Sequence, residues 1–257
     1  MKLVVYDLDH TLMPIDTGDI WCKWLLYACE PSVREEAEAT LDRFTCEYIA
    51  QTLSIDEYET WQMQFLTRFD RRDLEAARVS YKREILSKII PEGARATVEA
   101  AKCEGAVTVI CSATYSFATE LSAELFGVDH LLSVRPEEDR EGNFTGRWIE
   151  PITYQQGKVT AVKALVDELA ANGTEIDAYE FWSDSAADLA LFEYVDSLGG
   201  TCHVVNANES LRSLGRERGW IVGDTYTEAE FEAAAELVAK ALANRENAPR
   251  LQTRPSK

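Results

Sequence analysis

The sequence is short of positive charge. It has 26 lysines and arginines against 45 aspartates and glutamates, and its formal net charge is −19. A surface of this charge repels nucleic acids and anionic lipid headgroups, so neither is an expected partner. An anionic substrate would need a local positive device, such as a metal ion, a lysine or the N-terminus of a helix.

Long apolar runs and paired cysteines are also missing. No stretch approaches the roughly 20 apolar residues that cross a bilayer, and no basic segment followed by an apolar run marks a secretory signal. None of the 6 cysteines belongs to a CxxC pair, and the 3 histidines are scattered. These absences predict a cytoplasmic protein with reduced cysteines, without a zinc site or a disulfide framework. No feature indicates an oligomeric state.

Glycine is absent from residues 19–90, a stretch rich in glutamate, arginine and alanine with aromatic residues at helical spacing. That pattern predicts several helices packed on one another, with most of the aromatic side chains in their core. Elsewhere short buried strands alternate with helices. Strands are expected at 2–6, 106–111, within 131–150, at 177–184, 201–205 and 220–222, and helices at 92–104, 116–126, 157–171, 186–195, 208–218 and 227–244. The alternation predicts an α/β fold, a Rossmann-like parallel sheet with helices on both faces.

Polar side chains follow three of these strands. Because ligands bind outside the carboxyl ends of the strands in such sheets, these side chains are expected to meet. In chain order they are Asp7 and Asp9, then Ser112 and Thr114, then Asp184 and Asp188, with Lys158 opening the helix before the third strand.

Two carboxylates one residue apart in a crowded site repel each other unless a cation compensates them. Aspartate oxygens and water are ligands that suit octahedral Mg2+, so a Mg2+ site is expected here. The cation, Lys158 and the free N–H groups near Ser112 would then attract a phosphate. One aspartate could attack phosphorus to form an acyl phosphate, and a second could protonate the leaving alcohol and later activate water.

The order DLDHT, a distant Ser112, Lys158 and then DSAAD resembles the four-motif signature of the haloacid dehalogenase superfamily. The resemblance covers residues 1 to about 222. It is strongest to the phosphoserine-phosphatase-like branch, in which a helical cap is inserted between the first and second motifs. The expected organisation is a discontinuous core at 1–15 and 91–225, a helical cap at 16–90, a C-terminal helix at 226–246 and a flexible tail at 247–257.

The resemblance implies a role for each motif residue. Asp7 would be the nucleophile and Asp9 the acid/base. Mg2+ would be held by Asp7, the backbone carbonyl of Asp9 and Asp184, with Asp188 as a further or more distant ligand. The remaining roles are phosphate binding by Ser112, Ala113 and Lys158, and orientation of the loop by Thr11. The implied activity is Mg2+-dependent hydrolysis of a small phosphorylated metabolite through an aspartyl-phosphate, with an amino-alcohol phosphate, phosphoserine or histidinol phosphate as the expected substrate.

The sequence departs from the branch in two places. The last motif reads SDSAAD instead of GDGxND, with Ser183 for the first glycine and Ala187 for the asparagine. In the cap, Asp16 stands where the phosphoserine enzymes have a substrate-binding glutamate, and Phe65 stands at the position of their arginine, with Arg68 close by. The group that would bind the carboxylate of phosphoserine is therefore not matched.

Other interpretations compete with these assignments. Asp7 and Asp9 could cap a turn at a strand end, and Thr114 competes with Ser112 for the phosphate. Asp16 and Asp19 could cap the helix that follows DTGD instead of contacting substrate. A phosphotransferase or mutase would share the aspartyl-phosphate, and a non-catalytic module would bind phosphate or metal without turnover.

Overall fold

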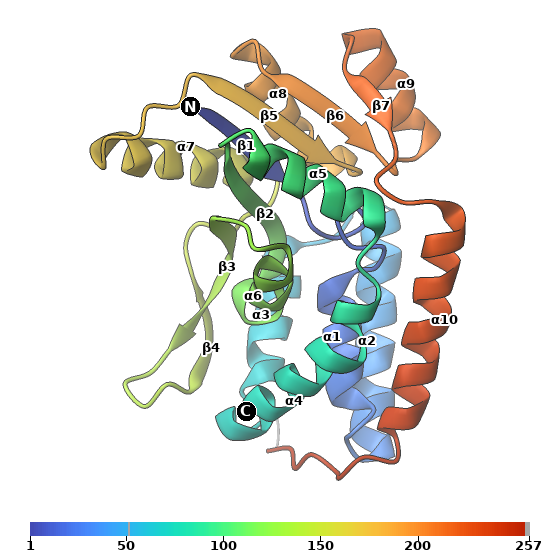
Figure 1. Ribbon diagram of the computed structural model, residues 1–257. Coiled ribbons are helices and arrows are strands. Elements are labelled where there is room, and N and C mark those ends of the chain that lie inside the picture. Colours follow the sequence, from blue (N-terminus) through green and yellow to red (C-terminus); the bar gives the residue numbers. More distant parts are fainter. Residues whose placement is uncertain (51, 255–257) are drawn as a thin grey trace.

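The computed structural model describes residues 1–50 and 52–254, and a seven-stranded sheet lies at its centre (Figure 1). The strand order is β4-β3-β2-β1-β5-β6-β7, and all neighbours are parallel except β3 and β4. The strands are β1 (Lys2–Tyr6), β2 (Val107–Tyr115), β3 (His130–Glu138), β4 (Phe144–Ile149), β5 (Ala178–Ser183), β6 (Thr201–Val205) and β7 (Ile221–Gly223). The predicted parallel sheet is confirmed, with β1 at its centre.

Ten α-helices and two short 3-10 turns complete the described part of the chain. The helices are α1 (Thr17–Leu26), α2 (Pro31–Ile49), α3 (Ile55–Leu66), α4 (Arg71–Glu84), α5 (Glu92–Cys103), α6 (Ser116–Phe126), α7 (Gln156–Ala171), α8 (Leu189–Ser197), α9 (Glu209–Arg218) and α10 (Glu228–Arg245). The 3-10 turns are Leu86–Lys88 and Ala186–Asp188. None of the described helices is long and apolar enough to cross a membrane.

Alternate side chains of the central strands serve two separate cores. On β1, Val4 and Tyr6 belong to a cluster shared with α5, α6, α10 and the inserted helices. Leu3 and Val5 point to the other face and join a cluster formed with α7, α8 and α9. This period of two is the reason that a strand buried on both faces reads as an unbroken apolar run.

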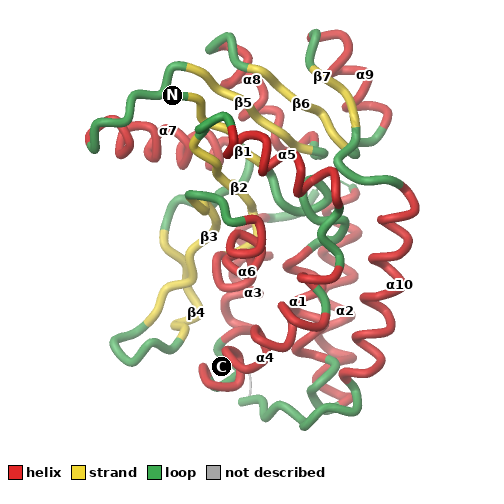
Figure 2. The backbone as a smooth tube through the Cα atoms, viewed as in Figure 1, coloured by secondary structure: helices red, strands yellow, loops and turns green. Residues whose placement is uncertain are grey.

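The inserted helices α1 to α4 form the predicted helical cap, gathered beyond one end of the sheet (Figure 2). Helix α10 packs beside α1, and the chain after it runs along the cap. In this predicted flexible tail, Leu251 N donates to the Ala28 carbonyl at 2.7 Å and Arg254 N donates to the Arg68 carbonyl at 2.8 Å. Residues 255–257 lie outside the described residues.

Most predicted boundaries lie within about a residue of the structure, and two elements differ more. Strand β2 was expected to end at residue 111, but it runs to Tyr115, with a register shift against β3 after Cys111. The helix expected at 186–195 is divided into a 3-10 turn and α8. The small polar run at 112–114 lies within the register shift of β2, and pairing with β3 resumes beyond it, where Tyr115 pairs with Val134.

Candidate active site

The nucleophile candidate, Asp7, is fixed at the carboxyl end of the central strand. Its N–H continues the sheet by donating to the Trp182 carbonyl at 2.9 Å, and its side chain is buried. Three residues on, His10 has a φ of 56°, in the left-handed region that few non-glycine residues adopt. Asn206 Nδ2 and the Tyr226 hydroxyl each donate to the His10 carbonyl at 2.9 Å. These two bonds hold the turn that brings the following residues back over the sheet edge.

Lys158 lies between two buried carboxylates. Its Nζ is 2.7 Å from Asp7 Oδ1 and 2.8 Å from Asp188 Oδ2, and the lysine is 3% exposed. Burial lowers the pKa of Lys158, but the negative charges of Asp188 and Asp7 outweigh this effect and raise it above its ordinary value. The lysine therefore stays charged and holds the Asp7 carboxylate in one orientation.

Local geometry explains the glycine before this lysine. A Cβ at Gly157 would lie 1.8 Å from the carbonyl oxygen of Ile152, so only glycine lets the start of α7 approach the preceding loop. On the far side of the lysine, the Ser183 hydroxyl donates to Asp188 Oδ2 at 2.7 Å. The serine that replaces the expected glycine thus orients the carboxylate that anchors Lys158.

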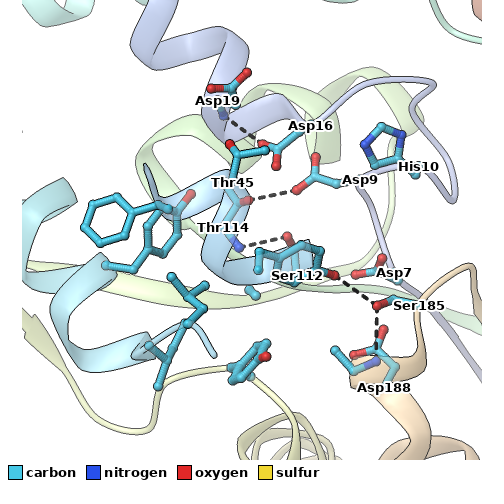
Figure 3. A pocket seen from close by; sticks show the side chains of 18 of the residues that line it. Asp7, Asp9, His10, Asp16, Asp19, Thr45, Ser112, Thr114, Ser185 and Asp188 are labelled. Carbon is cyan, nitrogen blue, oxygen red and sulfur yellow. Dashed lines mark hydrogen bonds between the residues drawn. The ribbon is translucent and has the colours of Figure 1, made fainter. Parts of the chain in front are cut away.

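Asp9 is held apart from this ion pair. Its Oδ1 accepts a hydrogen bond from Thr17 N at 2.7 Å, and its Oδ2 accepts one from Thr114 Oγ1 at 2.8 Å (Figure 3). Burial raises the pKa of Asp9, and the charge of Asp7 raises it further, against the hydrogen bonds from Thr17 and Thr114. A carboxyl whose pKa is raised towards neutrality suits proton transfer in both directions. Burial likewise raises the pKa of Asp7 to about 6, although Lys158 opposes the shift.

The last carboxylate of the site, Asp184, is tied to the first motif. Thr11 Oγ1 donates to Asp184 Oδ1 at 3.0 Å and accepts from Asp184 N at 3.0 Å. Burial raises the pKa of Asp184 well above its ordinary value, and repulsion from Asp7 adds to the effect. An added cation near Asp7 and Asp184 would relieve this repulsion, and both groups offer the hard oxygen atoms that Mg2+ prefers.

The carboxylates do not form a ready-made metal cage. In the residues that the structure describes, no three acidic, histidine or cysteine side chains are grouped closely enough to hold a metal ion by themselves. Both oxygens of Asp188 are 2.8 Å from Lys158 Nζ. The donor set therefore fits a cation bound by Asp7, Asp184, a backbone carbonyl and water, with Asp188 occupied by the lysine.

The end of β2 supplies the hydroxyl and amide groups expected for phosphate binding. Ser112 is 1% exposed, and its hydroxyl accepts from Thr114 N at 3.1 Å. Its carbonyl accepts from Thr153 Oγ1 at 2.6 Å, which fixes the strand end. Ala113 lies between the two hydroxyl residues and lines the same cavity. Because Thr114 is bonded to Asp9, Ser112 is the better placed of the two for a phosphate.

These side chains line one cavity of about 330 Å³, and the cap forms its other wall. Such a volume suits a small ligand. The cap side chains that line it are mostly apolar or aromatic: Leu41, Phe44, Tyr48, Leu53, Ile55 and Tyr58. The Tyr48 hydroxyl lies 3.2 Å from Ser185 Oγ, so a cap side chain touches the loop that carries Asp184.

Asp16 caps helix α1 and also faces the cavity. Its Oδ1 accepts from Asp19 N at 2.7 Å as the N-cap of α1, and it also lines the cavity (Figure 3). Phe65 and Arg68 are not among the residues that line the cavity. Phe65 is buried in the cap, where its ring stacks on Trp61.

The structure brings the predicted motif residues together, and it adds residues that motif reasoning missed. Thr17 reaches Asp9 through its backbone, and Asn206 and Tyr226 support the His10 turn. A backbone donor leaves no trace in side-chain identity, and the two supporting residues follow a different strand some 200 positions away, with no motif to mark them. The DTGD capping pattern before α1 is the one signal that could have placed Thr17 near the site.

The strand ends of this Rossmann-like sheet thus gather four aspartates and one buried lysine under a helical cap. A model of the haloacid dehalogenase-like hydrolase family matches residues 4–193, and the chain belongs to this family. The resemblance seen in the four motifs is thus confirmed.

Several of the similar proteins carry the names of phosphatases. The chain is 26% identical over 224 residues to a histidinol-phosphatase of Neisseria meningitidis, covering 86% of this chain and 97% of that protein. It also resembles a crystal structure of a Bordetella pertussis protein of unknown function, with 28% identity, a TM-score of 0.79 and coverage of 88% and 99%. A phosphoserine phosphatase structure with a phospho-aspartyl intermediate analogue shares the fold, with 19% identity, a TM-score of 0.59 and coverage of 89% and 95%.

Proposed function

We propose that the protein hydrolyses a small phosphate monoester through an aspartyl-phosphate on Asp7. The observation that carries this proposal is the separation of roles between two neighbouring carboxylates. The Nζ of the buried Lys158 lies 2.7 Å from Asp7 Oδ1. Asp9 is instead held by Thr17 and Thr114 and does not contact the lysine. A capping or purely structural role would not need two such different environments one residue apart.

In the first step, a carboxylate oxygen of Asp7 attacks phosphorus while the bond from phosphorus to the ester oxygen breaks. The leaving alkoxide takes a proton from Asp9, and Asp9 becomes a carboxylate. Lys158 and Ser112, with the N–H groups around Ala113, would bind the phosphate oxygens and offset their growing charge. The product alcohol departs and the phosphate remains on Asp7 as an acyl phosphate.

In the second step, Asp9 accepts a proton from water as the water oxygen attacks phosphorus. The acyl-phosphate bond breaks, which restores the Asp7 carboxylate and releases inorganic phosphate. Mg2+, held by Asp7, Asp184 and the Asp9 carbonyl, would supply positive charge against the phosphate. Asp7 and Asp184, which would hold it, are carboxyls whose pKa values are raised by burial and by the charge of a neighbouring aspartate.

Relatives support the substrate class. Proteins named histidinol-phosphatase and phosphoserine phosphatase act on small phosphorylated metabolites, and a cavity of about 330 Å³ is suited to molecules of that size. We infer a comparably small substrate here, and we expect it to be met in the cytoplasm. Cell fractionation of the source organism tests the location.

The test is phosphate release from a panel of phosphorylated metabolites, with and without Mg2+. Wild-type protein should release phosphate only with the metal, and Asp7→Asn should lower kcat at least about 1,000-fold because the nucleophile is lost. Asp196→Asn, a substitution of an exposed carboxylate on α8, serves as the matched control. Full activity in Asp7→Asn would refute the mechanism. Dominant transfer of phosphate to an added alcohol would favour the phosphotransferase alternative.

A further inference from the structure

We propose that the cavity selects phosphate esters whose leaving alcohol carries a protonated amine and an apolar ring or chain, and rejects esters that carry a carboxylate. The inference rests on the proposed function, because it names the substrate class of that reaction. It also divides the named relatives' substrates, since phosphoserine carries a carboxylate and histidinol phosphate does not.

The first support is the balance of charge in the cavity. Among the described residues that line it, Lys158 is the only lysine or arginine, and its ammonium group is already shared between Asp7 and Asp188. Asp16 and Asp19 line the same cavity from the start of the cap. Asp19 is paired with Lys23, whose Nζ lies 2.8 Å from Asp19 Oδ2, so this lysine is already engaged as well. A second anion on the substrate would therefore lie among carboxylates without a free cation of its own.

The remaining basic group that lines the cavity, His10, does not change this balance. Its positive charge would lie close to Asp16, where it lowers the pKa of that carboxyl against the larger effect of burial. The Asp16 carboxyl thus faces both His10 and the repelling charge of Asp9. In Figure 3 the His10 ring lies beside Asp9 and Asp16.

The second support is the position of the nearby cap arginine. Arg68 lies at the end of α3, where its carbonyl accepts from Arg254 N and its charge acts on Cys29 at the far end of α1. Phe65 is 2% exposed and packs against Phe69 as well as Trp61. Phe65 has no charge, and Arg68 does not line the cavity, so the cap offers no arginine for a substrate carboxylate at this place.

The third support is the apolar and aromatic part of the cavity lining. Phe44 and Tyr58 contact each other edge to face, with ring centroids 5.2 Å apart, and both line the cavity. Leu41 and Ile55 extend the apolar surface. An aromatic wall attracts a protonated amine through its ring faces and an unsaturated ring by stacking. Carboxylates and aromatic rings that line one cavity match a cationic, partly apolar leaving group.

Discrimination of this kind acts through repulsion as well as attraction. A carboxylate that enters the cavity loses its water and meets like charges without compensation, which is an effective way to reject a ligand. We expect at least about a 100-fold difference in kcat/KM between two esters that differ only in a carboxylate.

The experiment compares such a pair, phosphoethanolamine and phosphoserine, and adds an amino-alcohol phosphate with an aromatic ring, phenylalaninol phosphate. Wild-type kcat/KM should rise in the order phosphoserine, phosphoethanolamine, phenylalaninol phosphate. Equal or greater turnover of phosphoserine than of phosphoethanolamine would overturn the inference. Equal turnover of the two amino-alcohol phosphates would overturn its apolar part.

A positive charge introduced into the cavity should reverse part of the discrimination against the carboxylate ester. Thr45 lines the cavity beside Asp16 and Asp19, so Thr45→Arg should raise the ratio of phosphoserine to phosphoethanolamine turnover at least about 10-fold (Figure 3). Thr40→Arg places the same charge on α2 outside the cavity and should leave the ratio within about 2-fold. Identical ratios in the two variants would contradict selection by charge in the cavity.

A neutral reporter separates the two proposals. p-Nitrophenyl phosphate carries neither an amine nor a carboxylate, so its hydrolysis reads the proposed reaction alone. If it is hydrolysed while the carboxylate makes no difference, the selectivity inference fails and the proposed function stands. If no ester in the set is hydrolysed, the proposed function fails and the inference fails with it.

Discussion

A buried carboxyl in the cap predicts an unusual dependence of stability on pH. Glu59 on α3 is 1% exposed, and neither of its carboxylate oxygens has a hydrogen-bond partner among the described residues. Burial raises the pKa of Glu59 from 4.5 to about 8. An acid with this environment is neutral in the folded protein at pH 7 and ionised in the unfolded chain.

The size of the effect follows from the shift. The pKa difference between the folded and unfolded chain is 8 − 4.5, or 3.5. At about 1.36 kcal/mol for each pKa unit, ionisation opposes folding by about 5 kcal/mol in total. Below pH 4.5 both states hold the proton and there is no penalty. The penalty grows as pH rises from about 4.5, where the unfolded chain ionises, and is complete above about 8, where the folded protein ionises too.

The assay is chemical unfolding of wild-type protein and Glu59→Gln between pH 5.5 and 8.5. The amide cannot ionise, so the variant should gain about 3 kcal/mol of unfolding free energy relative to wild type across this range. Titration of the active-site aspartates is common to both proteins and cancels in the difference. Asp56→Asn, at an exposed position on the same helix, should show no such trend. A difference between wild type and Glu59→Gln that does not change with pH would refute the reasoning.

Three further outcomes are expected around Lys158. Lys158→Met should lower the unfolding free energy by about 3–5 kcal/mol, since it leaves buried carboxylates uncompensated, and urea unfolding checks this. Ser183→Ala should lower kcat several-fold with little change in KM in a steady-state assay, because it removes the hydroxyl that orients the Asp188 carboxylate. Ser185→Ala leaves that contact intact and should lower kcat less in the same assay. Gly157→Ala should lower the Tm by several degrees in thermal unfolding, because its Cβ would meet a carbonyl oxygen.

The sheet was predictable because its signals are local. The run of Leu3 to Tyr6 is apolar on both faces, and such a run without helical length predicts a buried parallel strand. The end of β2 was missed because Ser112 and Thr114 look like the start of a loop, although the strand pairs with β3 again at Tyr115. Local polarity reports on the side chain, whereas the strand boundary is set by pairing with a neighbour.

In the site, motif spacing predicted the meeting of Asp7, Lys158 and Asp184, because the carboxyl ends of parallel strands share one edge. It did not predict that Asp188 would be held by the lysine on both oxygens, since spacing carries no orientation. The carboxyl of Glu59 was equally hidden, because a polar residue on the inner face of a helix contradicts the pattern used to find that face.

The path of residues 228–254 limits how the cap can move. Helix α10 leaves the core after β7, packs against α1 and ends with Arg245 over the Trp24 ring, at 4.7 Å from its centroid. Leu251 and Arg254 then bond to the backbone at the ends of α1 and α3. A rigid swing of the whole cap would break all of these contacts at once. A turn of the half-exposed Tyr48 side chain, which lines the cavity, would break only its hydrogen bond to Ser185. Entry of a substrate past Tyr48 therefore needs a smaller change than movement of the cap. We therefore expect a substrate to enter by movement of single side chains and not by a swing of the whole cap.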